Sequence, residues 1–325
     1  MKALLCTAYG PLDQLTVQEV AAPRPGPQQV LIDIKAAALN FPDALMVQGL
    51  YQVKPPLPFS PGAEFSGVIA EIGAEVRHCK VGDPVIAFGL GGFAEQAVAD
   101  AARIMPLPPG MDFDTGAAFG LTYCTSLHGL RDCGRLQAGE TLLVLGAAGG
   151  VGVAAIEIGK AMGARVIAAA SSADKLALCK QLGADDTINY ATENLRERID
   201  ALTGKRGVDV VYDPVGGPYT EPAVRSLAWG GRLLVVGFAA GDIPKIAINH
   251  LLLKERSLVG VYWGESVKHN PKQHLGNVRQ LLEWFDAGKV KPIISERVPL
   301  AGASNAMARL AGRQVMGKVI VLPEA

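Results

Sequence analysis

The residues with the clearest capacity for chemistry form a glycine-rich turn between an apolar strand-like run, 142–145, and a helix-like run, 153–160. Glycines at 146, 149 and 152 make the turn a variant of the dinucleotide fingerprint G-x-G-x-x-G, with alanine at the middle glycine. Small residues let the backbone approach a pyrophosphate, and the helix N-terminus supplies unpaired N–H groups and a favourable dipole. Tight packing of the helix on the strand is the alternative explanation. The residues predicted to bind the dinucleotide are Gly146, Ala148, Gly149, Gly150, Val151 and Gly152.

The end of the next strand-like run indicates which dinucleotide fits. A cofactor with a free 2′-hydroxyl usually meets an Asp or Glu about 20 residues beyond the fingerprint, but Ala170 and Ser171 stand there. A carboxylate would repel a 2′-phosphate, whereas Ser171 and Ser172 can donate hydrogen bonds to it and Lys175 supplies a cation. We therefore expect NADPH rather than NADH. In the alternative, Ser172 simply caps the following helix and Lys175 faces solvent.

Composition limits the classes of protein that remain. A chain of 325 residues, 49% apolar and 19% charged, can form about two domains with ample cores. Lys+Arg and Asp+Glu are both 31, so the chain has no net positive charge that would attract nucleic acid or an anionic membrane. Five scattered cysteines without a Cys-x-x-Cys pair argue for reduced thiols and against a structural zinc site. With no signal-peptide pattern and no apparent membrane span, we expect a cytoplasmic protein that binds neither nucleic acid nor membrane.

The pattern of predicted secondary structure changes along the chain. The first third has short strand-like runs broken by Pro and Gly, at 29–36, 67–73 and 83–88, which predict a small barrel or sandwich. A breaker-rich stretch, 106–110, then precedes a predicted helix at 114–131.

From residue 141 strands and helices alternate, which predicts an α/β, doubly wound parallel sheet. The strands are expected at 141–145, 165–170, 185–189, 208–212, 231–236 and 257–261, with helices at 174–182, 194–202 and 219–227. Two further helices, 272–287 and 302–312, and a closing strand, 317–322, come too late for this sheet and are assigned to the first domain. The predicted domains are 1–120 with 263–325, mainly β, and 121–262, which binds the dinucleotide.

A set of motifs in sequence order extends the interpretation to the whole chain. They are LNFPD (39–43), GLY (49–51), PGAEFSGV (61–68), GLT (120–122), GAAGGVG (146–152) and YDPVGG (212–217). Together they resemble the quinone oxidoreductase (zeta-crystallin-like) branch of the medium-chain dehydrogenase/reductase superfamily. The resemblance implies a GroES-like catalytic domain built from both chain ends, a Rossmann domain between them, and a homodimer whose Rossmann sheets join edge to edge.

Departures from the zinc-dependent alcohol dehydrogenases of this superfamily are equally informative. Those enzymes carry a Gly-His-Glu motif whose His binds the catalytic zinc, and here Ala63 stands in the triplet Gly62-Ala63-Glu64. Their first zinc-binding Cys falls where this chain has 40–42, and their lobe of four Cys is missing. Alanine cannot ligate zinc, so no metal is expected, and Glu64 is interpreted as structural.

The resemblance also implies roles for single residues. Asn40 is expected near the nicotinamide, with a turn residue before Pro42 as the alternative. Tyr51 is expected to line the substrate cleft, unless it packs on the nearby prolines, and Thr122 to lie beside the cofactor, unless it caps a helix. Further cofactor contacts are expected from Lys175, Tyr190 and Arg313 at the adenosine phosphate and from the Gly237-Phe238 turn at the carboxamide.

These expectations define a reaction. The sequence offers no Ser-His-Asp arrangement and no Cys/His pair at a recognisable spacing, so the chemistry is assigned to NADPH. An electrophile that accepts hydride without a Lewis acid is a quinone, an enone, an alkenal or an enoyl thioester. We expect a quinone or activated-alkene reductase in which Asn40 orients the nicotinamide or the substrate carbonyl and Tyr51 hydrogen-bonds the substrate oxygen. The alternatives are a 2-enoyl thioester or alkenal reductase on the same fold, and a non-catalytic, crystallin-like NADPH-binding protein.

Overall fold

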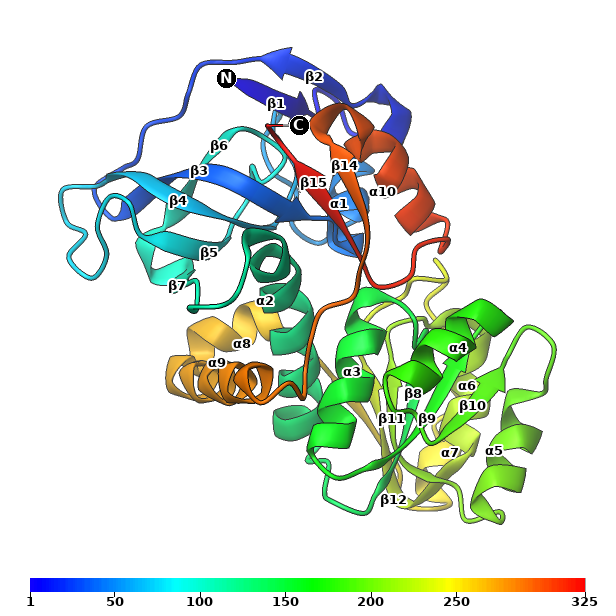
Figure 1. Cartoon of the computed structure of the whole chain (residues 1–325). Helices are drawn as coiled ribbons and strands as arrows, with labels where there is room; N and C mark the ends of the chain where they lie inside the picture. The colour runs from blue at the N-terminus through cyan, green and yellow to red at the C-terminus, as the bar shows by residue number, and fades with distance from the viewer. Residues whose placement is uncertain (325) are drawn as a thin grey trace. The chain divides into compact units, whose positions relative to one another are not determined.

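The computed structural model describes residues 1–324, which fall into two compact units (Figure 1). One unit combines Met1–Leu121 with the chain from Pro292 onward, and the other comprises Thr122–Lys291. The chain returns to the first unit at 292, whereas the sequence analysis placed the return at 263. The difference arises because α8 (Trp263–His269) and α9 (Pro271–Asp286) belong to the second unit. There, Asn277 Nδ2 of α9 donates to Asp132 Oδ2 at 2.7 Å, and Leu281 is fully buried.

A parallel sheet of six strands forms the centre of the second unit. Its order is β10-β9-β8-β11-β12-β13, and every neighbouring pair is parallel. Because parallel strands end at one edge, the loops after β8, β9, β10, β11 and β12 gather there, and the strand order reverses direction between β8 and β11. This confirms the predicted doubly wound sheet. The strands are β8 (Thr141–Leu145), β9 (Arg165–Ala170), β10 (Asp186–Asn189), β11 (Val208–Asp213), β12 (Leu227–Val235) and β13 (Ser257–Gly260).

Helices cover both faces of this sheet (Figure 1). Successive strand residues point to opposite faces, so Leu142 and Leu143 of β8 mark the two. A Cβ on Gly159 of α3 would lie 2.7 Å from Leu142 Cδ2, so α3 packs directly on the first face. Leu143 shares an apolar cluster with Ile199 of α5 and Val224 of α6 on the other. The helices are α3 (Gly150–Ala161), α4 (Ala173–Gln181), α5 (Leu195–Thr203), α6 (Thr220–Arg225) and α7 (Asn249–Leu252).

The first unit is built on a mainly antiparallel sheet with the order β14-β15-β3-β4-β5-β7, in which β6 also pairs with β3. The last strand, β15, lies antiparallel to β3 with Ile320 opposite Ala38. Val319, Ile320 and Val321 are at most 1% exposed, so the end of the chain completes the core of the N-terminal strands. The strands of this sheet are β3 (Gln29–Ala38), β4 (Glu64–Ile72), β5 (Pro84–Phe88), β6 (Gln96–Asp100), β7 (Ile104–Pro106), β14 (Ile294–Pro299) and β15 (Lys318–Leu322). Strands β1 (Lys2–Leu5) and β2 (Thr16–Glu19) form a separate two-stranded antiparallel sheet.

Helices α1 (Phe41–Val47) and α10 (Ala303–Ala311) pack in the first unit, and α2 (Phe113–Leu127) contains the unit boundary. The sequence predicts one continuous helix over 114–131. In the structure the α-helix ends at Leu127 and a π-helical turn, His128–Cys133, follows. A π-helical turn changes which side chains share a face, and such turns are frequent at functional sites.

Candidate functional site

The glycine turn after β8 contains glycines of two kinds. Gly146 has φ +58°, and a Cβ there would come within 2.7 Å of Val215 Cγ2. A Cβ on Gly152 would lie 2.4 Å from the carbonyl oxygen of Gly146. The fold therefore requires both glycines, as the packing explanation states. Gly149 has an extended φ of −78°, and a Cβ there would only touch the Gly146 oxygen at 3.4 Å. The fold does not require glycine at 149, which favours a ligand near that position.

The ends of β9 and β10 lie side by side because Asn189 pairs with Ala170. Lys175 Nζ donates to Ser171 Oγ at 3.3 Å, so a cation and a hydroxyl meet directly after β9. Ser172 caps α4, since its Oγ accepts from the Lys175 N–H at 3.4 Å. The cap is compatible with a phosphate contact, so the predicted binding role of Ser172, like that of Ser171 and Lys175, stays a prediction.

After β10, Tyr190 lies against a second aromatic ring. Its N–H donates to the Ala170 carbonyl at 3.1 Å, which fixes it beside the end of β9. The ring lies 4.3 Å from that of Tyr219, centroid to centroid, at an interplanar angle of 41°. The structure thus brings Tyr190 to the same sheet edge as the Ser171–Lys175 pair.

The loops after β11 and β12 are held together by Asp213, a residue whose role the sequence analysis missed. Asp213 is 2% exposed, and its Oδ1 accepts the N–H groups of Val215 at 2.9 Å and Gly216 at 2.8 Å. Its carbonyl accepts the Gly237 N–H at 3.3 Å. Burial raises the pKa of Asp213, against the opposing effect of these donors. A Cβ on Gly216 would lie 2.9 Å from Phe238 Cδ1, so the two predicted carboxamide-binding residues pack tightly on the Asp213 turn.

A mainly apolar hollow of about 180 Å³ lies beside these loops. The hollow is lined by two polar residues, Asp213 and Thr220, and by apolar residues that include Val235, Phe238, Ile243 and Leu258. All of these residues belong to the second unit.

In the first unit, the predicted site residue Asn40 is 4% exposed and joins a buried polar cluster. Its Oδ1 accepts from Lys318 Nζ at 2.6 Å, and its Nδ2 donates to Glu64 Oε2 at 3.1 Å and to the Ala38 carbonyl at 3.3 Å. Lys318 Nζ also lies 3.4 Å from Glu64 Oε2. Burial raises the pKa of Glu64 and lowers that of Lys318, while their mutual attraction opposes both shifts.

Three backbone contacts tie this cluster to the recognised motifs. Glu64 is fully buried, and its Oε1 accepts the Leu121 N–H at 2.6 Å. Asp43 accepts the N–H groups of Asn40 at 2.9 Å and of Ala63 at 3.0 Å, and burial raises its pKa to about 7. Sequence reasoning missed Lys318, although a single lysine opening an otherwise apolar strand was a usable signal.

The remaining predicted residues are distributed over both units. Tyr51 is half-buried against the core of the first unit, and Arg313 is exposed in that unit with φ +59°. Thr122 lies inside α2 and is 2% exposed, so the helix-cap alternative is wrong for it. The convergence of these three residues on one ligand stays a prediction.

The π-helical turn also contains a Cys/His contact that the sequence analysis did not recognise. His128 Nε2 lies 3.4 Å from Cys133 Sγ, and His128 Nδ1 lies 3.0 Å from Asp132 Oδ2. Side chains five residues apart do not share a face of an α-helix, whereas this π-helical turn brings them together, which explains why spacing alone did not reveal the pair. Within residues 1–324, no group of three or more His, Cys, Asp or Glu side chains is arranged to hold a metal ion.

Comparison with known proteins agrees with this architecture. Residues 26–109 match the family model of the alcohol dehydrogenase GroES-like domain, and 150–284 match that of the zinc-binding dehydrogenases. Quinone oxidoreductase-like protein 2 of Rattus norvegicus is 38% identical over 325 residues, covering 98% of this chain and 91% of the relative. No helix of residues 1–324 combines the length and apolar character that crossing a membrane requires.

Solved structures show the same likeness. The Escherichia coli quinone oxidoreductase complexed with NADPH has a TM-score of 0.94 at 27% identity, over 99% of this chain and 100% of that one. The CurK enoyl reductase has a TM-score of 0.88 at 27% identity, over 99% and 98%. The chain is thus an oxidoreductase of the medium-chain dehydrogenase/reductase superfamily. It belongs to the quinone oxidoreductase-like branch, which confirms the predicted family and the predicted pairing of a GroES-like with a Rossmann domain.

Proposed function

We propose that this protein is an NADPH-dependent reductase that transfers a hydride to a quinone or another conjugated carbonyl compound without a catalytic metal. The observation that carries the proposal is the carboxyl edge of the parallel sheet. There, the open position at Gly149 and the Ser171–Lys175 pair follow the neighbouring strands β8 and β9. Space beside a helix N-terminus suits a pyrophosphate, and a cation with a hydroxyl donor suits a 2′-phosphate.

Three groups of residues would hold NADPH. The glycine turn and the first N–H groups of α3 would hold the pyrophosphate, because those groups have no partner within the helix. Ser171, Lys175 and Tyr190 would hold the adenosine phosphate, and Arg313 is proposed as a further cation. Backbone groups of the Gly237-Phe238 turn would hold the carboxamide, and the Asp213 contacts keep that turn rigid. When bound, NADPH supplies the hydride.

The hydrogen bonds of Asn40 support one of its two expected roles. The Asn40 Nδ2 group donates both of its hydrogens, one to Glu64 and one to the Ala38 carbonyl. Asn40 Oδ1 accepts one hydrogen bond, from Lys318. An amide oxygen has two lone pairs, so Asn40 retains acceptor capacity on Oδ1. Asn40 would therefore accept a hydrogen bond from the nicotinamide carboxamide rather than donate one to a substrate carbonyl. Donation to the substrate oxygen is assigned to Tyr51.

Metal independence rests on the same cluster. Ala63 offers no ligand atom at the position of the zinc-binding histidine. The ammonium of Lys318 lies 2.6 Å from Asn40 Oδ1 and 3.4 Å from Glu64 Oε2, so it already supplies the positive charge that the buried carboxylate requires. A divalent cation at this place would be repelled by the ammonium.

One experiment tests the proposed reaction against its alternatives. NADPH oxidation is measured in steady state with matched panels of quinones, alkenals and 2-enoyl thioesters. Turnover that is highest with quinones or simple enones supports the proposal. Turnover confined to enoyl thioesters supports the second candidate, which the likeness to the CurK enoyl reductase favours. Tight NADPH binding without turnover on any panel would identify a non-catalytic binding protein.

We further propose that the protein is a homodimer joined at β13. Within residues 1–324 this strand pairs only with β12, so its other edge is open. Exposed apolar side chains accompany it, with Leu258 38%, Ile248 80% and Leu252 79% exposed. Open strand edges and apolar patches typically mark association surfaces. Light scattering should give twice the chain mass for the wild type and the single-chain mass for Leu252→Glu combined with Leu258→Glu; a wild-type monomer would refute the assignment.

A further inference from the structure

A polar cluster in the second unit, outside the glycine turn, surrounds a thiol. Cys133 is half-buried, and its Sγ lies 3.4 Å from His128 Nε2. The other ring nitrogen, His128 Nδ1, lies 3.0 Å from Asp132 Oδ2. Asp132 is held in turn by Asn277 Nδ2, which donates to the same oxygen at 2.7 Å. This order of groups, thiol to imidazole to carboxylate, is the arrangement that activates a nucleophile through a neighbouring base.

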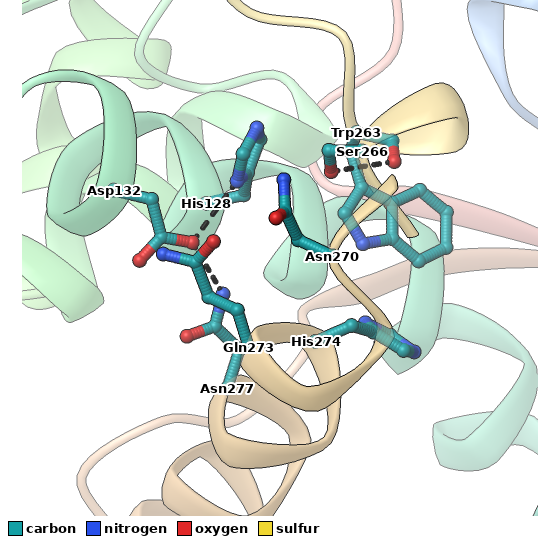
Figure 2. Close-up of a pocket in the computed structure, with 8 residues that line it drawn as sticks. All are labelled: His128, Asp132, Trp263, Ser266, Asn270, Gln273, His274 and Asn277. Atoms are coloured by element: carbon teal, nitrogen blue, oxygen red, sulfur yellow. Dashed lines mark hydrogen bonds and ion pairs between the residues drawn. The ribbon is translucent and has the colours of Figure 1, made fainter. Parts of the chain in front are cut away.

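A small hollow opens beside this chain of hydrogen bonds. Figure 2 shows His128 and Asp132 facing Asn270, Gln273 and Asn277 of the α8–α9 region, while the ring of His274 lies toward that of Trp263. Asn277 is 2% exposed and lies in the wall of the hollow, and its Oδ1 has no hydrogen-bond partner in the part of the chain that the structure describes. A buried acceptor without a donor is costly in a folded protein. The hollow has a volume of about 10 Å³, which suits a group the size of a water molecule that donates to this oxygen.

We propose that Cys133 is a covalent modification site for conjugated carbonyl electrophiles, with His128 as its proton partner and Asp132 and Asn277 as positioning residues. The thiol and the imidazole share one proton; when that proton lies on His128 Nε2, the sulfur attacks the β-carbon of the electrophile as a thiolate. An S–C bond forms, the C=C π bond breaks, and its electron pair moves toward the carbonyl oxygen as an enolate. The imidazolium then returns the proton to the enolate, so thiol and enone combine without any further reactant. This reaction needs neither NADPH nor the proposed hydride transfer.

The charges around His128 favour the imidazolium form that this step uses. The hydrogen bond to Asp132, followed by that to Cys133, raises the pKa of His128 to about 9, while burial opposes the shift. On the same turn, Arg131 Nε lies 3.4 Å from Asp132 Oδ1 and favours the carboxylate. From α9, His274 lines the same hollow, and burial together with the charge of His128 lowers its pKa. A neutral His274 adds no second positive charge that would oppose His128.

The test compares cysteines within the intact protein. The full chain is treated with a limiting amount of N-ethylmaleimide, a conjugated dicarbonyl, and labelling of each cysteine is followed by peptide mass spectrometry. Cys79 is the internal control, because it is half-buried like Cys133 and burial raises its pKa. A neighbouring imidazole that takes the thiol proton raises the reactivity of a cysteine. Lower intrinsic nucleophilicity offsets part of this gain, and we expect Cys133 to react about tenfold faster than Cys79.

Two variants separate activation from simple exposure. His128→Gln keeps a hydrogen-bonding side chain without a cation, and it should lower the Cys133 rate about tenfold without changing the Cys79 rate. Asp132→Asn should lower it less, since the imidazole remains. Equal wild-type rates at the two cysteines, or an unchanged Cys133 rate in folded His128→Gln, would overturn the proposal. Equal wild-type rates would overturn the proposal even where a variant fails to fold.

Discussion

The sharpest test of the dinucleotide site is the substitution Gly149→Val. Gly149 has φ −78° and ψ 170°, a conformation that valine adopts readily. A Cβ there would meet only the Gly146 oxygen, at the ordinary contact distance of 3.4 Å. Loss of a favourable N-cap residue costs roughly 0.5–1 kcal/mol, and reduced freedom of the unfolded chain offsets roughly 0.4–1 kcal/mol. The free energy of unfolding should therefore stay within about 1 kcal/mol of the wild-type value.

NADPH binding should respond very differently. A valine side chain at 149 projects into the space assigned to the pyrophosphate, and a bound phosphate cannot retreat from it while it remains hydrogen-bonded to the N-terminus of α3. We expect the dissociation constant for NADPH to rise at least about a hundredfold, which corresponds to about 2.8 kcal/mol. Titration calorimetry measures this constant, and thermal melting by circular dichroism measures the stability of the same samples.

Matched glycine variants complete the experiment. Gly149→Ala adds only the Cβ and should fold normally with a smaller loss of affinity. Gly152→Val introduces the same side chain where a Cβ would lie 2.4 Å from the Gly146 oxygen, so it should destabilise the fold itself. A well-folded Gly149→Val protein with wild-type affinity for NADPH would refute the assignment and leave the turn as a packing device.

Three further outcomes follow from the described contacts. Lys175→Ala should raise the Michaelis constant for NADPH about tenfold and leave that for NADH little changed, because a charge-assisted hydrogen bond to phosphate is worth roughly 1.5–3 kcal/mol; equal effects in steady-state kinetics would make Lys175 structural. Activity should survive exhaustive chelation with no stoichiometric zinc by elemental analysis, and loss reversed only by zinc would contradict metal independence. The pKa of His128 is raised from 6.5 to about 9, so its stabilising contribution is complete below 6.5 and is lost as pH rises through about 9. Urea unfolding should accordingly show a larger difference between wild type and His128→Gln at about pH 6 than at about pH 10, and a difference independent of pH would contradict the assignment.

The local sequence was enough to predict most of the secondary structure of the second unit. The apolar run 142–145 and the following glycines predict a strand, a turn and a helix because backbone geometry and side-chain periodicity act over a few residues. The repeated alternation then predicts a doubly wound sheet, since parallel strands require crossover helices. The sequence alone also led to the expectation of no zinc site, because Ala63 cannot ligate a metal. It further placed Ser171 and Lys175 directly after β9, where the structure shows them in contact.

Only the tertiary structure decided which distant residues share a site. Lys318 lies 278 residues from Asn40 and 254 from Glu64, and β15 brings it to both by pairing with β3. Periodicity carries no information on such pairings, because they depend on how whole elements pack. The same holds for α9, which packs in the second unit through Asn277 and Leu281, although its sequence suits either unit. The same residue type, glycine, stands at 149 and 152. Only the surrounding backbone shows that the fold requires glycine at 152, whereas the space at 149 is open to a ligand.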